Sequence, residues 1–434
     1  MSRPDLPALR PGDRVALLLP GSPAYVDLVL SLLRRGVFCV PMDVGLTDAE
    51  RAPLLADVDP VLVVEDQAHL EALLAAHPDD PALGPPRGRP VHLTSGTTGR
   101  PKGVWSGLLD EPAATALAAE ERELWGFVAD DVNLVLSPLH HSAPLRFAMG
   151  TRLAGGRVVV PGPFDAARVT RAIAEERPTS MFCVPAHLQR LLAHWDRVGP
   201  PDLRCFRLVA HAGAPCPEQV KRRLVDLFPA GSTWEFYGST EGQFTACPSE
   251  EWLRRPGTLG PARPGRTMTV DADGRLWCVV PPHARFEYLG APDKTAAAWR
   301  ETSAGPAFTV GDLGRIDEDG HVHLDGRRED LVISGGVNVY PAEVERALAR
   351  CAGVEDVAVF GVPDATWGQR VCAAVGGTAE EAALREHART HLAPAKRPKD
   401  YHRLDALPRT ATGKVRRLDL PDLTGATGTT RDGA

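Results

Sequence analysis

The feature that most constrains the fold is an alternation of short apolar runs and amphipathic stretches between residues 157 and 236. The apolar runs at 157–160, 181–184, 207–210 and 233–236 predict strands, and the stretches 165–176, 186–195 and 218–228 predict helices. Strands that alternate with helices at this spacing favour a parallel sheet covered on both faces. Ligands bind beyond the carboxyl ends of such strands, so residues 211–215 and 237–241 are expected to share one crevice.

The length predicts more than one domain, because 434 residues exceed one ordinary core. Residues 14–19 and 24–35 predict a first strand and helix, and short β-like pieces with Asp-Gly turns follow Gly265. The expected fold is α/β, with layered sheets and helices in a large N-terminal domain. We expect that domain over residues 1–328, a small α+β domain over 329–423, and a frayed tail over 424–434.

Composition excludes several classes of protein. A net charge of -7 argues against nucleic acid as the main partner, and no apolar run is long enough to predict a membrane span. The eight cysteines lack zinc spacing and fit a reducing compartment. The start of the chain has no apolar signal core, so a cytoplasmic location is expected.

The segment from Thr94 to Gly103 has the composition of a phosphate-binding loop. Its ten residues include three glycines, four hydroxyl residues and Lys102. Glycines bring backbone N–H groups close to an anion, hydroxyls add donors, and the lysine adds charge. The spacing is not that of a Walker A loop. Taken alone, the segment could also be a solvated turn between two strands.

Four further motifs follow in order, at residues 237–241 (Tyr-Gly-Ser-Thr-Glu), 309–315, 325–345 and 408–414. Together with the loop, this ordered set resembles the adenylate-forming superfamily, which includes acyl-CoA synthetases, the adenylation domains of peptide synthetases, and luciferases. The resemblance extends from about Pro11 to about Arg417. It implies that ATP and Mg²⁺ are used to convert a carboxylic acid to an acyl-AMP, whose acyl group then passes to the thiol of CoA.

The resemblance also implies which residues bind the nucleotide. Tyr237 would stack on adenine, Asp312 would accept both ribose hydroxyls, and Glu241 would hold Mg²⁺. The full set of expected nucleotide-binding residues is Thr94, Ser95, Gly96, Thr97, Thr98, Gly99, Lys102, Gly213, Ala214, Tyr237, Gly238, Ser239, Asp312 and Arg327. Without the motifs, Glu241 could be a carboxylate at a helix N-terminus, and Asp312 a turn residue.

Catalytic roles follow from the same resemblance. Lys414 would bridge the carboxylate and the α-phosphate, Thr240 would donate to that phosphate, and His141 would gate the acid pocket. Neighbouring His140 and His141 are expected to point in different directions. Glu329 would be the hinge of the small domain, and Gly335 and Gly336 would form part of the thiol tunnel. The residues expected to line the acyl pocket are Val184, Pro185 and His211.

The sequence also departs from the superfamily. Less chain than usual precedes the loop, so part of the N-terminal subdomain is expected to be trimmed, and Val310 stands where relatives carry Thr. The leading interpretation is an acid–CoA ligase. An adenylating enzyme that serves a carrier protein or an amine, and a non-catalytic nucleotide-binding relative, are the alternatives. The last of these is disfavoured by four motif residues, Lys102, Glu241, Asp312 and Lys414. A homodimer is left open, and the acid is undetermined.

Overall fold

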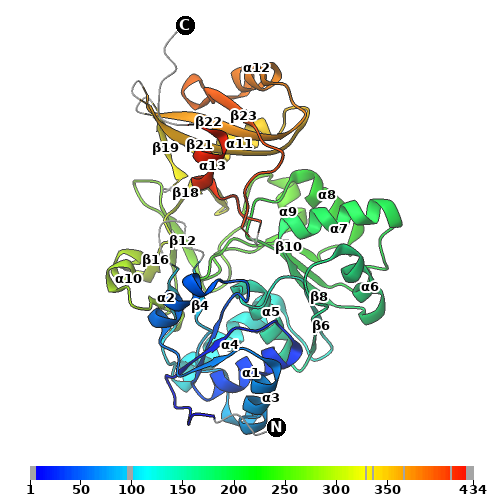
Figure 1. Cartoon of the computed structure of the whole chain (residues 1–434), viewed down its shortest axis with the longest axis vertical. Coiled ribbons are helices and arrows are strands. Elements are labelled where there is room, and N and C mark those ends of the chain that lie inside the picture. Colours follow the sequence, from blue (N-terminus) through cyan, green and yellow to red (C-terminus); the bar gives the residue numbers. More distant parts are fainter. Residues whose placement is uncertain are drawn as a thin grey trace. The chain divides into compact units, whose positions relative to one another are not determined.

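The computed structural model describes residues 6–94, 101–327, 330–334, 337–364, 367–410 and 413–426. The chain divides into two compact units, and Figure 1 labels many of their elements. Unit 1 comprises Met1–Thr269, Trp277–Val310 and Asp317–Val322, and unit 2 comprises Val270–Leu276, Gly311–Ile316 and His323–Ala434.

Unit 1 begins with a three-stranded parallel sheet in the order β2-β1-β3. Its strands are β1 (Arg14–Leu17), β2 (Phe38–Pro41) and β3 (Leu62–Val64), and its helices are α1 (Pro23–Arg34), α2 (Asp48–Val58) and α3 (Gln67–Ala76). Helix α1 begins where the Ser22 hydroxyl accepts from the Tyr25 N–H at 3.1 Å. The buried residues of β1 and α1 form one continuous apolar core, and the predicted first strand and helix are both present.

The alternating segment forms the main sheet of unit 1, in the order β11-β10-β9-β8-β6-β7. All neighbouring pairs are parallel except β10 and β11. The strands are β6 (Val132–Val135), β7 (Arg157–Val159), β8 (Ser180–Cys183), β9 (Leu208–His211), β10 (Thr233–Glu235) and β11 (Cys247–Pro248). The helices are α5 (Ser142–Leu153), α6 (Ala166–Glu176), α7 (Pro185–Val198) and α8 (Glu218–Leu227). The predicted parallel sheet is confirmed, with boundaries that shift by one to three residues.

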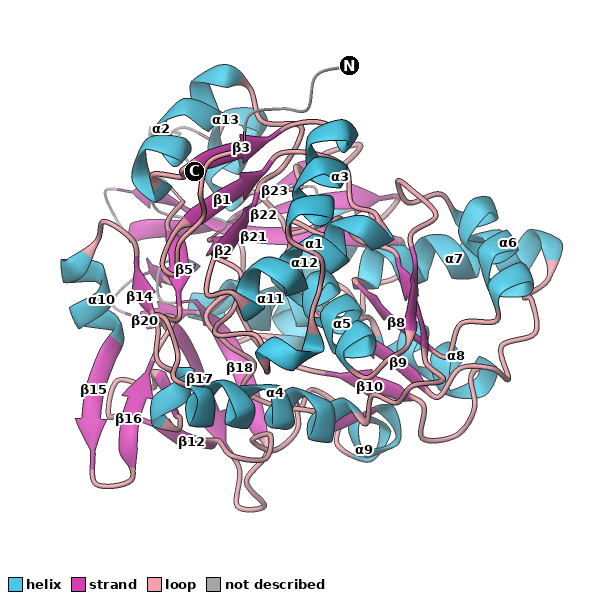
Figure 2. Cartoon of the chain, turned by 90° about the horizontal axis from the view of Figure 1, so that it is seen from below, coloured by secondary structure: helices cyan, strands magenta, loops and turns pink. Residues whose placement is uncertain are grey.

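Helices cover both faces of this sheet because the strand residues alternate. Met181 packs with α6, α7 and α8, whereas its neighbour Phe182 packs with aromatic residues of α4 (Glu111–Trp125) and α5. Figure 2 shows α5 on one side of β8 and β9, and α7 and α8 on the other. The carboxyl ends of β9 and β10 therefore reach the same edge of the sheet, between two packed layers.

Two antiparallel sheets complete unit 1. One has the order β14-β5-β4 and the other β12-β13-β16-β15. Their elements are β4 (His92–Leu93), β5 (Gly103–Trp105), β12 (Thr267–Val270), β13 (Leu276–Val279), β14 (Glu287–Tyr288), β15 (Trp299–Thr302) and β16 (Gly305–Phe308), with helices α9 (Ser249–Arg254) and α10 (Pro292–Ala298) nearby in the chain. The register pairs His92 with Val104 and Val104 with Tyr288, which brings distant parts of the sequence together.

Unit 2 contains a two-stranded sheet of β17 (Asp312–Ile316) and β18 (Val322–Arg327) and a five-stranded sheet. The latter consists of β19 (Val332–Ser334), β20 (Val337–Val339), β21 (Val354–Asp364), β22 (Gly368–Gly377) and β23 (Asp400–Arg403). Helices α11 (Pro341–Leu348) and α12 (Glu381–His391) pack on one face, and α13 (Leu420–Thr424) packs on the other. The expected smaller α+β region is therefore present.

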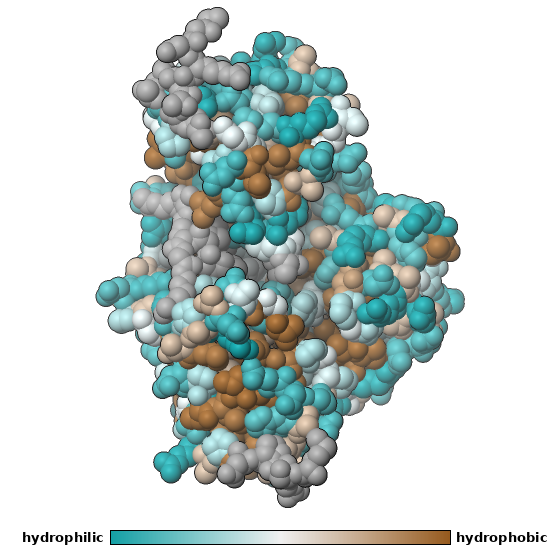
Figure 3. All heavy atoms as spheres, in the orientation of Figure 1, coloured by the Kyte–Doolittle hydropathy of each residue, from teal (hydrophilic) through white to brown (hydrophobic). Residues whose placement is uncertain are grey.

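On the face seen in Figure 3, hydrophobic residues reach the surface in several separate groups among hydrophilic ones. Within the described ranges, no helix combines the length and apolar character needed to cross a bilayer.

Candidate active site

The strands β4 and β5 flank the predicted phosphate loop. The backbone N–H of Thr94 donates to the Lys102 carbonyl at 2.9 Å, and the Thr94 hydroxyl accepts from the Lys102 N–H at 3.1 Å. These bonds close the base of the loop. The Lys102 ammonium lies 2.9 Å from the carboxylate of Asp57 on α2. The predicted residues Ser95, Gly96, Thr97, Thr98 and Gly99 lie outside the described ranges.

The segments after β9 and β10 lie at the same edge of the main sheet, because Glu235 pairs with His211 in register. Gly213 follows β9 with a φ of +93°, a conformation that favours glycine, and leads into Ala214. Tyr237 follows β10, is buried, and packs against the ring of Phe244 at 4.7 Å. Both predicted segments therefore lie at this edge of the sheet.

The motif at 237–243 forms a tight turn. Gly238 bridges to Gln243, and the Ser239 N–H donates to the Gly242 carbonyl at 2.8 Å. A Cβ on Gly238 would lie 2.9 Å from that carbonyl oxygen, closer than real Cβ contacts allow. The turn holds Thr240 and Glu241 at its tip.

Glu241 is a buried carboxylate, with 7% of its surface exposed. Its Oε1 accepts from the Tyr288 hydroxyl at 2.6 Å, and its backbone oxygen accepts from Arg89 Nη1 at 3.0 Å. The carboxylate and the main chain of this residue are thus held from two sides. A buried carboxylate fixed in this way is a hard oxygen donor that fits Mg²⁺.

His141 lies at the N-terminus of α5, next to a small cavity. Burial, and then the adjacent His140, lower the pKa of His141 to about 4, so the ring is neutral near pH 7. The rings of His140 and His141 lie 4.1 Å apart. The expectation that the two rings point in different directions is therefore wrong, because the turn before α5 places them in contact. The cavity is lined by Arg89, Pro90, His92, Val104, Ser142, Arg146, Thr240 and Gly242.

A network of partly buried charges lies beside this cavity. Glu121 on α4 accepts from Arg146 at 2.7 Å and from Arg263 at 3.0 Å. Burial alone would raise the pKa of the Glu121 carboxyl, but the two guanidinium groups lower it to about 2. The carboxylate of Glu120 likewise accepts a hydrogen bond from the Arg266 guanidinium, at 2.8 Å. These pairs tie α4 to α5 and to the segment before β12.

The residues expected to line the acyl pocket lie at the ends of β8 and β9. Val184 and His211 are buried, and Val184 belongs to the aromatic cluster of α4 and α5. Pro185 begins α7. The imidazole nitrogens of His211 have no hydrogen-bond partner among the described residues, and burial lowers its pKa.

Unit 2 carries the other predicted residues. Asp312 begins β17 and is buried, and Arg327 ends the neighbouring strand β18. Lys414 follows Gly413, whose φ is +82°, and its backbone N–H donates to the Thr410 hydroxyl at 3.2 Å. Its Nζ atom is buried. The side chain of Arg327 and the predicted residues Glu329, Gly335 and Gly336 lie outside what the structure describes.

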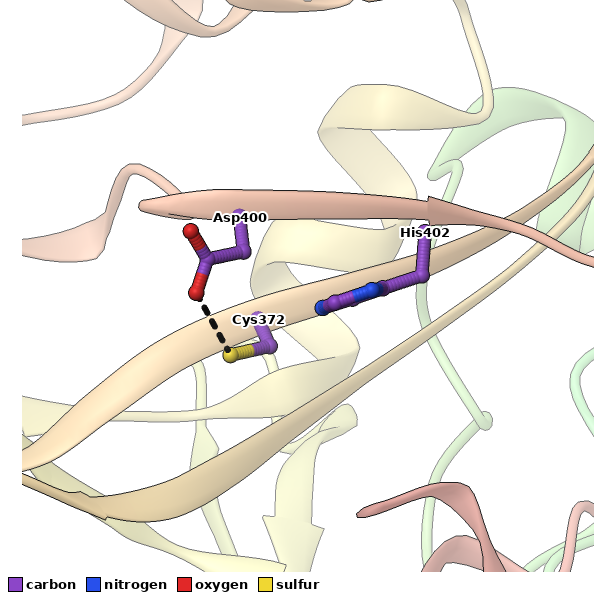
Figure 4. Close-up of side chains that lie close together, drawn as sticks. All are labelled: Cys372, Asp400 and His402. Atoms are coloured by element: carbon purple, nitrogen blue, oxygen red, sulfur yellow. Dashed lines mark hydrogen bonds between the residues drawn. The ribbon is translucent and has the colours of Figure 1, made fainter. Parts of the chain in front are cut away.

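A second group of chemically active side chains lies on the sheet of unit 2. Figure 4 shows Cys372, Asp400 and His402 close together, with the Cys372 thiol 3.7 Å from the Asp400 carboxylate. Arg370 pairs with the same carboxylate oxygen at 2.8 Å. Burial raises the pKa of the Cys372 thiol to about 11, so the sulfur keeps its proton near pH 7. We interpret Asp400 as the partner of Arg370 in an ion pair at the edge of the core, with Cys372 and His402 as its neighbours.

Sequence reasoning missed the residues that position Glu241. Arg89 and Tyr288 lie 152 and 47 residues from it and belong to no motif. Asp57, the partner of Lys102, was missed for the same reason. The pairing of β4, β5 and β14 brings Tyr288 and the segment of Arg89 together, whereas Asp57 comes from α2. A single sequence carries no signal of either contact.

Comparison with known proteins agrees with this fold. A model described as AMP-binding enzyme matches residues 7–87 and 90–282, and one described as AMP-binding enzyme C-terminal domain matches residues 343–414. The fold and the two matches define an adenylate-forming enzyme, as the motifs predicted. The chain belongs to the AMP-binding enzyme family.

Individual relatives have similar lengths. A feruloyl-CoA synthase of an Amycolatopsis species is 34% identical, over 94% of this chain and 88% of that protein. A fatty acid–[acyl-carrier-protein] ligase, ScoC of Streptomyces coeruleorubidus, is 31% identical over 95% and 87%. The crystal structure of ATP-bound MatB from Rhodopseudomonas palustris has a TM-score of 0.79 and 30% identity, covering 96% of this chain and 89% of that one.

Proposed function

We propose that the protein activates a carboxylic acid with ATP, forming an acyl-AMP and pyrophosphate, and then transfers the acyl group to CoA. The observation that carries this proposal is the buried Glu241, whose carboxylate accepts from Tyr288 and whose backbone oxygen accepts from Arg89, next to Thr240 at the carboxyl edge of the main sheet. The family and the feruloyl-CoA synthase relative support the same reaction. The chain is thus an AMP-forming acid–thiol ligase that uses ATP, Mg²⁺ and CoA.

Each residue has a physical role in this proposal. The first step brings a carboxylate against a polyphosphate, so neutralisation of charge dominates the barrier. Lys102 and the loop that begins at Thr94 hold the outer phosphates, Glu241 holds Mg²⁺, and Thr240 donates to the α-phosphate. Lys414 supplies the positive charge of the adenylation step.

The adenosine would bind through two further groups of residues. Tyr237 and the backbone of Gly213, Ala214, Gly238 and Ser239 face the base, and Asp312 with Arg327 holds the ribose. His141 gates the acid pocket. A neutral His141 suits that role, because a charged ring at the entrance would attract a second anion.

The loop residues Ser95, Gly96, Thr97, Thr98 and Gly99 complete the phosphate site in this proposal. We assign Glu329 as the hinge between a domain of residues 1–328 and one of residues 329–423, with Gly335 and Gly336 on the path of the thiol. All eight cysteines are free, which favours a reducing compartment such as the cytoplasm. A homodimer is compatible with the reaction.

The identity of the acyl acceptor needs its own test, because one relative is named as a ligase for an acyl carrier protein. With the acid identified, thioester formation is measured with CoA and, separately, with a phosphopantetheinylated carrier protein. Product with CoA alone supports the proposal. A thioester formed only with the carrier protein would show that the carrier protein, and not CoA, is the acceptor.

Acid-dependent ATP–pyrophosphate exchange tests the first step. The panel contains aliphatic, aryl and polycyclic acids, and Lys414→Ala is the control that should lose exchange. Exchange with one class of acid establishes adenylation and identifies that class. If no acid supports exchange while ATP still binds, the proposed reaction is wrong.

A further inference from the structure

The five-stranded sheet of unit 2 brings a thiol, a carboxylate and an imidazole to one point. In the parallel pair of β22 and β23, Cys372 lies opposite Asp400, and His402 follows two residues later on β23. Side chains two residues apart on a strand point to the same face, so His402 lies on the same side of the sheet as Asp400. One ligand atom from each of the three side chains lies within 4.8 Å of the other two.

The three groups face one another. Figure 4 shows the His402 ring pointing along the sheet toward Cys372 and Asp400, with a ring nitrogen at its leading end. The Nε2 atom of His402 is buried and has no hydrogen-bond partner in the described part of the chain. An imidazole nitrogen with an unused electron pair, held beside a thiol and a carboxylate, is a ready metal ligand.

The distance between sulfur and oxygen fits a tetrahedral ion. The Cys372 sulfur lies 3.7 Å from Asp400 Oδ2. In a tetrahedral zinc site, sulfur lies about 2.3 Å and oxygen about 2.0 Å from the metal, which places the two ligands roughly 3.5 Å apart. The pair is therefore already at the separation that zinc requires.

The local charge favours a divalent cation. Arg370 lies 2.8 Å from the Asp400 carboxylate and 3.6 Å from the Asp364 carboxylate, so two acidic groups neutralise its guanidinium. With Cys372 as a thiolate, these four side chains carry two net negative charges, which one zinc ion balances. The contact of Arg370 with Asp400 is itself common at metal sites, where ligating carboxylates are held by a second hydrogen-bonding group.

We propose that Cys372, Asp400 and His402 form a zinc site in unit 2, with water as the fourth ligand. A thiolate, an imidazole and a carboxylate are all zinc ligands, whereas Mg²⁺ and Ca²⁺ prefer oxygen alone. Binding breaks the S–H bond of Cys372, forms a Zn–S bond, and releases the proton to solvent.

The burial of the three residues gives the ion an entry path and a dry inner wall. The Asp400 side chain is 38% exposed, so zinc can arrive from that side with its water. Cys372 is fully buried in the apolar cluster that also contains Phe360 and Leu407. Leu407 lies between β23 and Lys414 in the chain, so the ion would strengthen the strand that leads into the segment of Lys414. The site does not depend on the adenylation reaction.

Titration with Co²⁺ tests the site on the full chain after removal of metals with a chelator. Cobalt takes zinc sites and reports a thiolate ligand through a charge-transfer band in the near ultraviolet. We expect that band to saturate at one Co²⁺ per chain and to disappear when Zn²⁺ is added. Co²⁺ at the proposed Mg²⁺ site of Glu241 would have oxygen ligands and give no such band. Zinc affinity is then measured by competition with a chromophoric chelator.

Two variants and two controls locate the ion. Cys372→Ser should abolish the band, and both Cys372→Ser and His402→Gln should weaken zinc binding at least about 100-fold, more than the loss of an outer partner typically costs. Cys351→Ser is the matched cysteine control, because Cys351 is also buried in unit 2 but lies outside the cluster. His391→Gln on α12 is the histidine control. Both controls should keep the wild-type band and affinity.

The outcomes decide between a metal site and a plain ion pair. If the wild-type protein gives no thiolate band, or if Cys372→Ser keeps it, the zinc site is wrong and the group is the Arg370–Asp400 ion pair with its neighbours. Zinc should also raise the melting temperature of the wild type and leave that of His402→Gln unchanged. If Cys372→Ser does not fold, His402→Gln decides alone, since an unchanged zinc affinity in that variant would overturn the proposal.

Discussion

At the scale of single residues, the site depends on side chains that hold other side chains. Glu241 and Lys102 were expected from the motifs, but Tyr288, Arg89 and Asp57 orient them and belong to no motif. A hydrogen bond contributes about 1 kcal/mol when both partners are buried. That is enough to fix one carboxylate rotamer, and it makes such positioning residues measurable by substitution.

The Tyr288 hydroxyl should matter for the metal. We expect Tyr288→Phe to keep the fold, because its ring packing on Phe286 at 5.3 Å needs no hydroxyl. The Glu241 carboxylate would lose its donor, and the Mg²⁺ concentration for half-maximal exchange should rise several-fold. Tyr401→Phe is the control, since the buried Tyr401 hydroxyl in unit 2 has no described partner. An unchanged Mg²⁺ dependence in Tyr288→Phe would contradict this role.

The free energy of unfolding should depend on pH through the Glu121 carboxyl. Its pKa is about 2 in the folded protein against an ordinary 4.5, so the folded state binds its proton less readily than the unfolded state. The contribution of Glu121 to stability is therefore complete above pH 4.5 and declines as the pH falls toward 2.

Urea unfolding at pH 5 and at pH 3 measures this contribution. Between these two values the wild type should lose about 2 kcal/mol more stability than Glu121→Gln, which has no proton to take up. Equal losses in the two proteins would show that the Arg146 and Arg263 pairs do not stabilise the folded state.

At the scale of elements, periodicity predicted the main sheet well. The strands β7 to β10 and the helices between them fall within one to three residues of the expected ranges, because each apolar run is short and bounded by polar turns. The antiparallel strand β11 was not expected, because a strand of two residues is too short to show an alternating hydrophobic pattern. For β4 and β5 the sequence indicated only that the loop could lie between two strands, and β14 was not expected, although all three build the site.

The turn at 237–243 should tolerate no side chain at Gly238. A Cβ there would meet the backbone of Gly242 and Gln243 at 2.9 and 3.0 Å. We expect Gly238→Ala to displace Thr240 and Glu241 and to reduce exchange at least tenfold, with little change in the melting temperature, since the turn is a local feature. Gly45→Ala is the matched control, because its Cβ would meet only the Asp43 side chain, at 3.3 Å. Full activity in Gly238→Ala would show that the turn can open.

At the scale of the whole molecule, the predicted residues belong to two units. Thr94, Lys102, His141 and Glu241 belong to unit 1, whereas Asp312 and Lys414 belong to unit 2. Unit 2 also takes up residues 270–276 and 311–316, which precede the expected domain boundary in the sequence. In the proposed reaction Lys414 of unit 2 acts in adenylation alone, so we expect its substitution to affect one half-reaction.

Lys414→Ala should separate the two half-reactions. Without the ammonium, acid-dependent exchange should fall by about 100-fold or more, the range seen when one group that stabilises developing charge is removed. Conversion of supplied acyl-AMP to the thioester should continue, because no carboxylate attacks a phosphate in that step. Both rates are measured on the same preparation, and Lys399→Ala, also in unit 2, is the lysine control. An equal fall in both rates would exclude a role confined to adenylation.

The sequence by itself determined the parallel α/β sheet, the smaller α+β unit and the ordered motifs, because periodicity, glycine-rich turns and charged motif residues are local properties of the chain. Only the tertiary structure decided which side chains hold Glu241 and Lys102, and that Arg89 and His92 share one small cavity with Thr240. The contact between the rings of His140 and His141 was decided in the same way. The physical reason is that these contacts join strands and helices up to 152 residues apart, and their register depends on packing across the whole unit.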